Sequence, residues 1–239
     1  MLVPNSIEIY KENLPEHATL PTQEEDIKKL YSQMKYAKTI NVLDSIKQAK
    51  NEEIYYKTDH HMTSLGAYLL YVSYCRKAGI TPAALTEFTE KEVSSSFLGT
   101  FDSKARLPNQ TPDRITIFEN EKNTDLKEVI YDSKTSKSIY NEEYLSKKDK
   151  YSYFLNGNNS KVVVKTKVEN GQKLLVIKDS YAHNMAQFLC QNYEEIHFID
   201  PRYYHLSLTE YAKENEITQI LVLYNYENLL TDLGVRGIK

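Results

Sequence analysis

Lys173–Cys190, KLLVIKDSYAHNMAQFLC, is the stretch that decides how this chain folds. Its apolar run Leu174–Ile177 shows no polar alternation, which predicts a strand buried on both faces of a parallel sheet. Asp179 and Ser180 follow at once, and Tyr181–Cys190 has the apolar spacing of a helix. A serine between a buried strand and a helix has the geometry of a nucleophile elbow, with the helix N-terminus facing a developing oxyanion. An ordinary helix N-cap has the same sequence pattern, so both interpretations stay open at this point.

Two further apolar runs, Glu195–Ile199 and Ile220–Leu223, follow the elbow, with a helix predicted over Leu208–Asn215 between them. Alternation of strands and helices is typical of a parallel α/β sheet. Right-handed crossovers bring the carboxyl ends of such strands to one edge, where these sheets bind ligands. We therefore expect Ser180 to share that edge with two residues that follow the later strands, Arg202 and Asn225.

The first third of the chain is predicted to be mainly helical. We expect three helices, over Gln23–Met34, Asn41–Lys50 and Leu65–Ala78. A short strand, Ile54–Tyr56, is expected before the third helix. The opening Leu2–Val3 resembles the tail of a strand whose beginning is missing, so we expect the chain to start inside a larger protein.

Residues 82–150 are predicted to form an inserted or edge-lying β element, with strands at Arg114–Phe118 and Leu126–Tyr131. Thr124–Ser138 has the composition of a solvent-facing hairpin. A further strand is expected at Val162–Val164, before the elbow. No internal repeat or flexible linker is visible, so we predict one α/β domain over residues 1–239.

The composition supports a globular protein and excludes several functions. The 239 residues include 41% hydrophobic ones, which is enough for one large core. The formal net charge of −3 leaves no footprint for nucleic-acid binding. Cys75 and Cys190 make no metal or disulfide framework, and they suit buried thiols as well as a single bridge. No apolar run reaches the length of a membrane span.

A serine nucleophile needs a base, usually a histidine oriented by a carboxylate. Of the six histidines, only His60 and His61 have a carboxylate within two positions at the end of a predicted strand. Asp59 and His61 are two residues apart, so in an extended segment they share one face and His60 points the other way. A His-His-Asp metal site and a polar helix start are the alternatives. Asp-x-His with one further histidine does not supply three convergent metal ligands by itself.

Ile54–Tyr68, IYYKTDHHMTSLGAY, resembles the signature of the DHHW protein family of Gram-positive bacteria. The match continues in order through four more segments, FLNGN (154–158), KLLVIKDSYAHNMAQFL (173–189), EEIHFIDPRYY (194–204) and ITQILVLYN (217–225). The family is similar to the SGNH-hydrolase-like domains of alginate and related polysaccharide O-acetyltransferases. The resemblance implies a flavodoxin-like parallel sheet flanked by helices. It also implies a permuted order, because Asp59 and His61 precede Ser180.

The resemblance also implies roles for residues. Ser180 is then the nucleophile, His61 the base and Asp59 the group that orients it, in an O-acetyltransferase or acetyl esterase without cofactor or metal. The oxyanion is expected to be bound by the Ser180 N–H together with the Gly157 N–H or the Asn225 amide. Three residues are expected to contact an anionic or hydroxylated glycan, His60, Arg202 and Tyr203. A surface ion pair is the alternative for Arg202.

Three residues depart from the family pattern. Met62 stands where the family has tryptophan, Lys178 where the wider superfamily has glycine in Gly-Asp-Ser, and Asn156 where we expect glycine. They keep a second function open, a catalytically weak glycan-binding or scaffold domain of an exopolysaccharide system. Relatives usually carry a membrane anchor and work outside the cell, so the resemblance implies an extracellular or cell-surface location, with a membrane anchor in the full-length protein. A cytoplasmic location is the alternative if the chain is complete. The expected partners are a polysaccharide or acylated glycan and a membrane acyl-donor protein.

Overall fold

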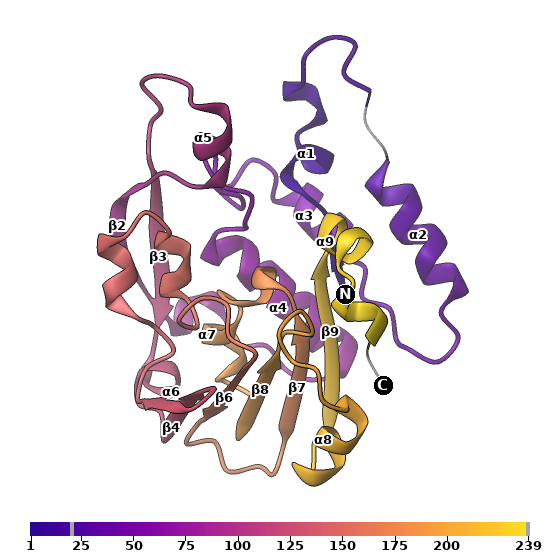
Figure 1. The fold of residues 1–239 in the computed structure, drawn as a ribbon, viewed down its shortest axis with the longest axis vertical. Coiled ribbons are helices and arrows are strands. Elements are labelled where there is room, and N and C mark those ends of the chain that lie inside the picture. The colour runs from indigo at the N-terminus through magenta and orange to yellow at the C-terminus, as the bar shows by residue number, and fades with distance from the viewer. Residues whose placement is uncertain (20–21, 238–239) are drawn as a thin grey trace.

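A seven-stranded sheet with helices on both faces forms the centre of the computed structural model, which describes residues 1–19 and 22–237 (Figure 1). The strand order is β1-β9-β7-β8-β6-β4-β5. These strands are β1 (Leu2–Val3), β4 (Glu128–Tyr131), β5 (Lys134–Ser136), β6 (Lys161–Lys165), β7 (Lys173–Lys178), β8 (Glu195–Ile199) and β9 (Gln219–Asn225). The α-helices are α1 (Ser6–Ile9), α2 (Gln23–Gln33), α3 (Leu43–Gln48), α4 (Ser64–Ala78), α5 (Thr100–Ala105), α6 (Glu121–Thr124), α7 (Ala186–Leu189), α8 (Leu208–Glu214) and α9 (Tyr226–Thr231).

The central strand β7 lies between β8 and β9 and is parallel to both. Leu174 and Val176 pack into the larger core, which also contains side chains of α4 and α7. Leu175 and Ile177 pack on the opposite face, in a second core with side chains of α2 and α8. The predicted strand with two buried faces is therefore confirmed, and its alternate residues belong to two different cores.

The sheet is mixed, and the prediction of a parallel sheet was wrong for its outer half. Strands β1, β9, β7 and β8 are parallel, whereas β6 runs antiparallel to β8 and to β4. The apolar run Val162–Val164 of β6 is buried, as in a parallel strand. A buried run carries no signal of direction, because its side chains lie on two covered faces whichever way the chain runs.

The helix predicted over Tyr181–Cys190 is broken in the structure. Ser180–Ala182 forms a 3-10 turn, and only Ala186–Leu189 is α-helical. The Asp179 carboxylate accepts the backbone N–H of Tyr181, and the following turns close by hydrogen bonds to the third residue back, such as His183 N–H to Ser180 carbonyl. Tight turns replace the regular helix, so the elbow lacks the long helix dipole that the sequence predicted.

The middle of the chain forms two separate β structures. Strand β2 (Thr89–Phe97) pairs with β3 (Asp113–Glu119) as a two-stranded antiparallel ribbon, which lies beside the main sheet (Figure 1). The β4–β5 hairpin instead continues the main sheet through β4, and its residues Val129 and Tyr131 are buried. The hairpin predicted over 124–138 is thus present, but one of its strands faces the core.

The strand predicted at Ile54–Tyr56 is reduced to a single bridge between Tyr55 and Met62. The segment between those two residues bends back on itself instead of extending. Both cysteines are free and buried. Among the helices of residues 1–19 and 22–237, none has the length and apolar character needed to cross a membrane.

Candidate active site

Asp59, His61 and Ser180 form an unbroken chain of hydrogen bonds. His61 Nδ1 lies 2.6 Å from Asp59 Oδ1, and His61 Nε2 lies 2.8 Å from Ser180 Oγ. A carboxylate can only accept, so His61 Nδ1 carries the proton and Nε2 accepts from the Ser180 hydroxyl. Asp59 and His61 are buried and Ser180 is half-buried. This is the arrangement in which a histidine can take the proton of an attacking serine.

The bend that carries Asp59 and His61 is fixed from three sides. Asp113 of β3 accepts hydrogen bonds from the backbone of Lys57 and Thr58, at 2.9 and 2.7 Å, and from the Thr58 hydroxyl at 2.6 Å. Thr100 donates its N–H and its hydroxyl to Asp59 Oδ2, at 2.8 and 3.1 Å. The Tyr181 hydroxyl donates to the carbonyl of His60. The β2–β3 ribbon and the elbow therefore hold the acidic and basic residues in place.

Gly99 is required by the close approach of this bend to the start of α5. A Cβ atom at position 99 would lie 2.2 Å from the Cβ and 2.4 Å from Oδ2 of Asp59. Contacts this short force the backbone to move. Any side chain at position 99 would therefore displace the carboxylate that orients His61.

Burial and hydrogen bonding act on the pKa values of Asp59 and His61 in opposite senses, and the net effect lowers both values. Burial lowers the pKa of His61 to about 4, although the Asp59 carboxylate acts to raise it. Burial also acts to raise the pKa of Asp59, but the imidazoles of His60 and His61 outweigh it and hold that pKa below its usual range. At neutral pH the imidazole is therefore neutral and the carboxylate charged, as a general base and its orienting group must be.

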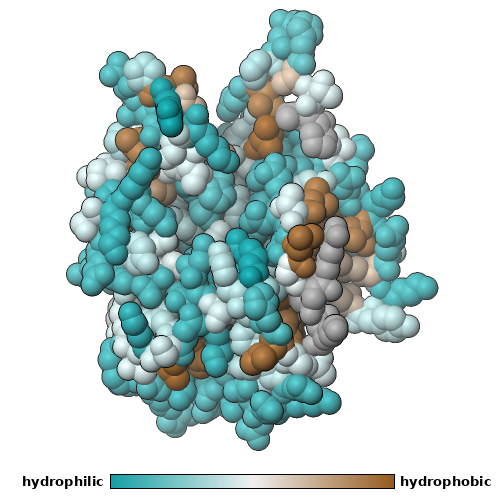
Figure 2. All heavy atoms as spheres, viewed as in Figure 1, coloured by the Kyte–Doolittle hydropathy of each residue, from teal (hydrophilic) through white to brown (hydrophobic). Residues whose placement is uncertain are grey.

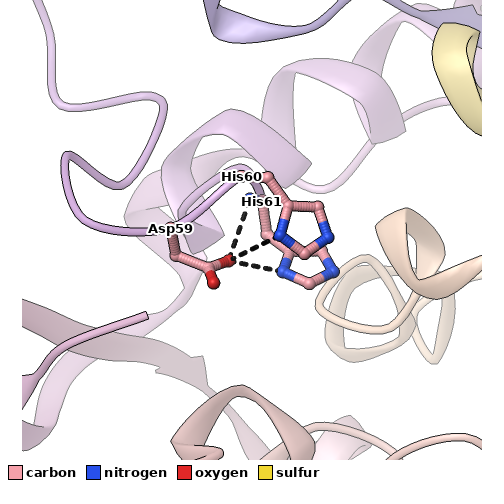
Figure 3. A group of neighbouring side chains, drawn as sticks. All are labelled: Asp59, His60 and His61. Carbon is pink, nitrogen blue, oxygen red and sulfur yellow. Dashed lines mark hydrogen bonds and ion pairs between the residues drawn. The ribbon is translucent and has the colours of Figure 1, made fainter. Parts of the chain in front are cut away.

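The prediction that His60 points away from His61 was wrong. The two rings lie side by side, with centroids 3.8 Å apart (Figure 3). His60 Nδ1 is 2.7 Å from the Thr100 hydroxyl. The reason is the bend: alternation of side chains across a segment holds only where the backbone is extended. His60 is therefore partly exposed beside His61.

Tyr151, which the sequence did not single out, contacts both His61 and Ser180. Its ring stacks on the His61 ring at 3.6 Å with an interplanar angle of 9°. Its hydroxyl donates to the backbone carbonyl of Ser180 at 3.1 Å. Tyr151 is buried and belongs to the 3-10 turn Lys150–Tyr153, so it limits how far the imidazole can rotate.

The elbow itself is anchored by the buried Asp179. Its carboxylate accepts the backbone N–H groups of Tyr181 and Asn225, at 2.9 and 2.8 Å, and the side-chain amide of Asn228 at 2.8 Å. Burial raises the pKa of Asp179, while these three donors act against that shift. The donors tie the end of β7 to the end of β9 and hold Ser180 at the sheet edge.

The hydrogen-bond donors of Asn225 and Gly157 already have other acceptors. The Asn225 amide donates to the Val3 carbonyl and to Asn5 Oδ1, and its oxygen caps α9. The Gly157 N–H donates to the Phe154 carbonyl at 3.2 Å, inside a turn. The expectation that either one supplies the second oxyanion donor is therefore not supported by these contacts, because their hydrogens already have acceptors.

Arg202 forms a bidentate ion pair with Asp200, at 2.8 and 2.6 Å. Its main contact is therefore the ion pair that was the alternative to glycan binding. Tyr203 is half-exposed and lies under the Arg202 guanidinium.

Asp200 is also 3.5 Å from the buried Lys178 ammonium, which donates to His183 Nε2 at 2.7 Å. Burial lowers the pKa of Lys178 to about 8, although Asp200 opposes the shift. Lys178 thus holds the base of the elbow where a glycine was expected.

Residues 1–199 match the protein-family description "DHHW protein". The chain belongs to the DHHW family. Asp59, His60 and His61 are the first three letters of that name in this sequence, and Met62 takes the place of the fourth. Met62 is buried in the larger core, and its carbonyl accepts from the Asn184 amide at 2.7 Å. Methionine therefore fills an apolar site there instead of exposing a stacking surface.

Solved structures resemble this DHHW chain over nearly its whole length. A DHHW family protein from Eubacterium siraeum DSM 15702 is 25% identical, with a TM-score of 0.87 over 99% of this chain and 80% of its own. PatB1 of Bacillus cereus, solved with a sulfonyl adduct, is 19% identical, with a TM-score of 0.79 over 100% and 84%. The O-acetyltransferase domain of Pseudomonas putida AlgJ is 13% identical, with a TM-score of 0.53 over 98% and 77%. The last two likenesses show a shared fold. A comparison with curated protein sequences gave no match.

Asp59, His60 and His61 of the DHHW motif also lie close enough together to be considered as metal ligands, with one donor atom of each within 4.8 Å of the others. However, His61 Nδ1 already donates to Asp59, and both Asp59 oxygens accept further hydrogen bonds. His61 Nε2 accepts from the Ser180 hydroxyl, so a metal at either nitrogen of His61 would have to break one of these two hydrogen bonds. The contacts of the three residues fit proton transfer to and from Ser180 better than coordination.

Proposed function

We propose that this DHHW protein is a serine O-acyltransferase or esterase that acts on acyl groups of extracellular or cell-wall polysaccharide. The observation that carries the proposal is the hydrogen-bond chain from Asp59 through His61 to Ser180. The similarity to a domain named O-acetyltransferase favours acetyl as the acyl group. We extend the proposal to an SGNH-like domain of permuted order over residues 1–239, in which the β2–β3 ribbon is the insertion.

In the proposed mechanism, Ser180 Oγ attacks the acyl carbonyl and passes its proton to His61 Nε2. Asp59 stabilises the imidazolium that forms, and the Ser180 backbone N–H donates to the oxyanion. The first amides of a helical turn have no partner within the turn, and one such donor contributes about 3 kcal/mol to lowering the barrier. Collapse expels the leaving alcohol, which takes the proton from His61, and leaves an acyl-serine.

In the second half of the reaction, a sugar hydroxyl gives its proton to His61 and attacks the acyl-serine. The ester moves to the sugar, and Ser180 recovers its proton from the imidazolium. Water in place of the sugar makes the enzyme an esterase. A polysaccharide or acylated glycan and a membrane acyl-donor protein remain the proposed partners, at the cell surface.

A chromogenic acetyl ester such as 4-nitrophenyl acetate tests the proposal directly. We expect turnover by the unaltered chain, and a loss of about 10³-fold or more in Ser180→Ala and in His61→Ala. A sulfonyl fluoride should modify Ser180, as detected by peptide mass, and His61→Ala should slow that labelling. His205→Ala, which changes an exposed histidine, is the matched control and should keep full turnover.

Two other results would point to different functions. Turnover that survives in Ser180→Ala and is abolished by a chelator would indicate a metallohydrolase. No turnover with any acyl donor, together with retained glycan binding, would indicate a binding or scaffold domain.

A further inference from the structure

Two hollows lie near the candidate active site, and the smaller of them is beside His60. The smaller has a volume of about 280 Å³ and is lined by His60 and by Asn228, whose amide holds Asp179 next to Ser180. The larger has a volume of about 750 Å³. Ser6 and Phe101 line both of them. Figure 2 shows the surface hollowed between two upper projections, which carry α5 and α1 in Figure 1.

Phe101 stands at the junction of the two hollows and offers an apolar surface there. It is 38% exposed, and its ring lies 6.4 Å from that of His60 at an interplanar angle of 62°. A pyranose ring has an apolar face of C–H groups and a rim of hydroxyls, so an exposed aromatic ring beside polar groups suits it. A sugar next to the reacting one would contact Phe101.

The larger hollow offers hydrogen bonds as well as aromatic surface. Tyr10, which is partly exposed, lines it with an aromatic ring, and Ser6 brings a hydroxyl group to its wall. A sugar packs on aromatic rings and exchanges hydrogen bonds with such polar groups. Asn13 and Asn51 add two carboxamides at the same hollow.

The charges along the two hollows cancel. Four cationic side chains line them, Lys50, Lys57, Lys104 and Arg114. Four carboxylates balance these, Glu52, Glu53, Asp113 and Glu227. A groove for a polyanion needs an excess of positive charge, since electrostatic attraction supplies most of the affinity for such a chain. A balanced groove fits an uncharged ligand instead.

We propose that the two hollows are one groove for a neutral glycan chain, with the acetylated sugar beside His60 and the next sugars across Phe101. This inference rests on the proposed function of Ser180. It predicts that the enzyme recognises at least two linked, uncharged sugars and discriminates against phosphate-bearing polymers of the same length.

Binding to the Ser180→Ala protein tests the groove independently of catalysis. We expect titration calorimetry to show that affinity rises about ten-fold from N-acetylglucosamine to its β-1,4-linked disaccharide and tetrasaccharide, which is about 1.4 kcal/mol. Phe101→Ala and Asn51→Ala, each combined with Ser180→Ala, should remove most of that gain. A glycerol-phosphate oligomer should bind weakly.

Tyr36→Ala is the matched control, because Tyr36 is a fully exposed aromatic residue that lines neither hollow, and it should leave the gain intact. Equal affinity for the single sugar and its oligomers would overturn the groove, as would stronger binding of the glycerol-phosphate oligomer. The two proposals can fail separately. Length-dependent binding without ester turnover would contradict only the serine mechanism, whereas ester turnover without length dependence would contradict only the groove.

Discussion

Single contacts determine the properties of His61. Asp59 sets its tautomer through the 2.6 Å bond, Tyr151 sets its ring plane by stacking at 3.6 Å, and burial lowers its pKa to about 4. The Asp-x-His spacing was predictable from the sequence because it is local. Tyr151 was not, because it lies 90 residues further along the chain and is one tyrosine among twenty.

Substitution of Tyr151 should separate its two contacts. Tyr151→Phe keeps the stacked ring and loses only the bond to the Ser180 carbonyl, so kcat should fall about 5-fold, as for one hydrogen bond of about 1 kcal/mol. Tyr151→Leu also frees the imidazole, and kcat should fall about 10²-fold. Loss of the ring lets water reach His61, so the acid limb of kcat/KM should rise from pH about 4 toward the ordinary histidine value of 6.5.

Tyr153→Leu is the control for Tyr151, because Tyr153 stacks on Tyr140 instead of on His61. It should leave the pH of the acid limb of kcat/KM unchanged. An acid limb that stays in place in Tyr151→Leu would show that the stacked ring does not shield the base.

Gly99→Ala should reduce activity through Asp59. The added Cβ would lie 2.2 Å from the Asp59 Cβ, so the carboxylate must move away from His61. We expect kcat to fall about 10²-fold or more per folded molecule, as for a misplaced catalytic group. Gly79→Ala is the control: its left-handed backbone makes it costly to the fold, but it meets no neighbour within 4 Å. It should lower stability and leave kcat unchanged.

Among the secondary-structure elements, α4 is the one that places the DHHW motif. It begins immediately after Thr63, whose side chain accepts the Gly66 N–H at 3.2 Å and donates to the Glu53 carbonyl at 2.6 Å. It ends at Gly79, which adopts the left-handed conformation. Such caps can be predicted from sequence because a few adjacent residues form them.

The helix after Ser180 was predicted wrongly because distant partners, Met62 and Asn225 among them, hold that segment in tight turns.

Thr63→Ala should therefore destabilise the protein by about 1 kcal/mol, the usual contribution of a helix N-cap. Urea denaturation followed by far-UV circular dichroism measures it. Thr22→Ala is a matched control, because Thr22 precedes α2 without a side-chain bond to the helix backbone. Its hydroxyl donates to the Glu25 carboxylate, and a smaller loss is expected. Equal losses of unfolding free energy in the two variants would show that the hydrogen bond from the Thr63 side chain to the helix backbone does not stabilise the protein.

For the whole molecule, buried ionisable groups make stability depend on pH. Burial lowers the pKa of His61 to about 4 and holds that of His183 well below its ordinary value, with the Lys178 charge adding to the second shift. Below pH 6.5 the unfolded chain binds protons that the folded chain does not, so acid favours unfolding.

The free energy of unfolding should therefore decrease as the pH falls from about 6.5 to about 4, and level off for His61 below that range. Urea midpoints at neutral pH and at pH about 5 measure the decrease. His183→Gln removes one of the groups and should flatten the dependence, whereas His205→Ala, at an exposed position, should not. A steeper dependence in His183→Gln would contradict the assigned direction of its pKa.

The sequence by itself determined the local features of this protein: the doubly buried strand β7, the caps of α4, the Asp-x-His motif and the serine that follows β7. Each depends on residues close together in the chain. Tertiary structure alone decided the direction of β6, the bend that brings His60 beside His61, the stacking of Tyr151, and the engagement of Asn225 and Arg202 by other partners. Those features depend on contacts between segments far apart in the chain, and a linear pattern of residues does not specify which segments meet.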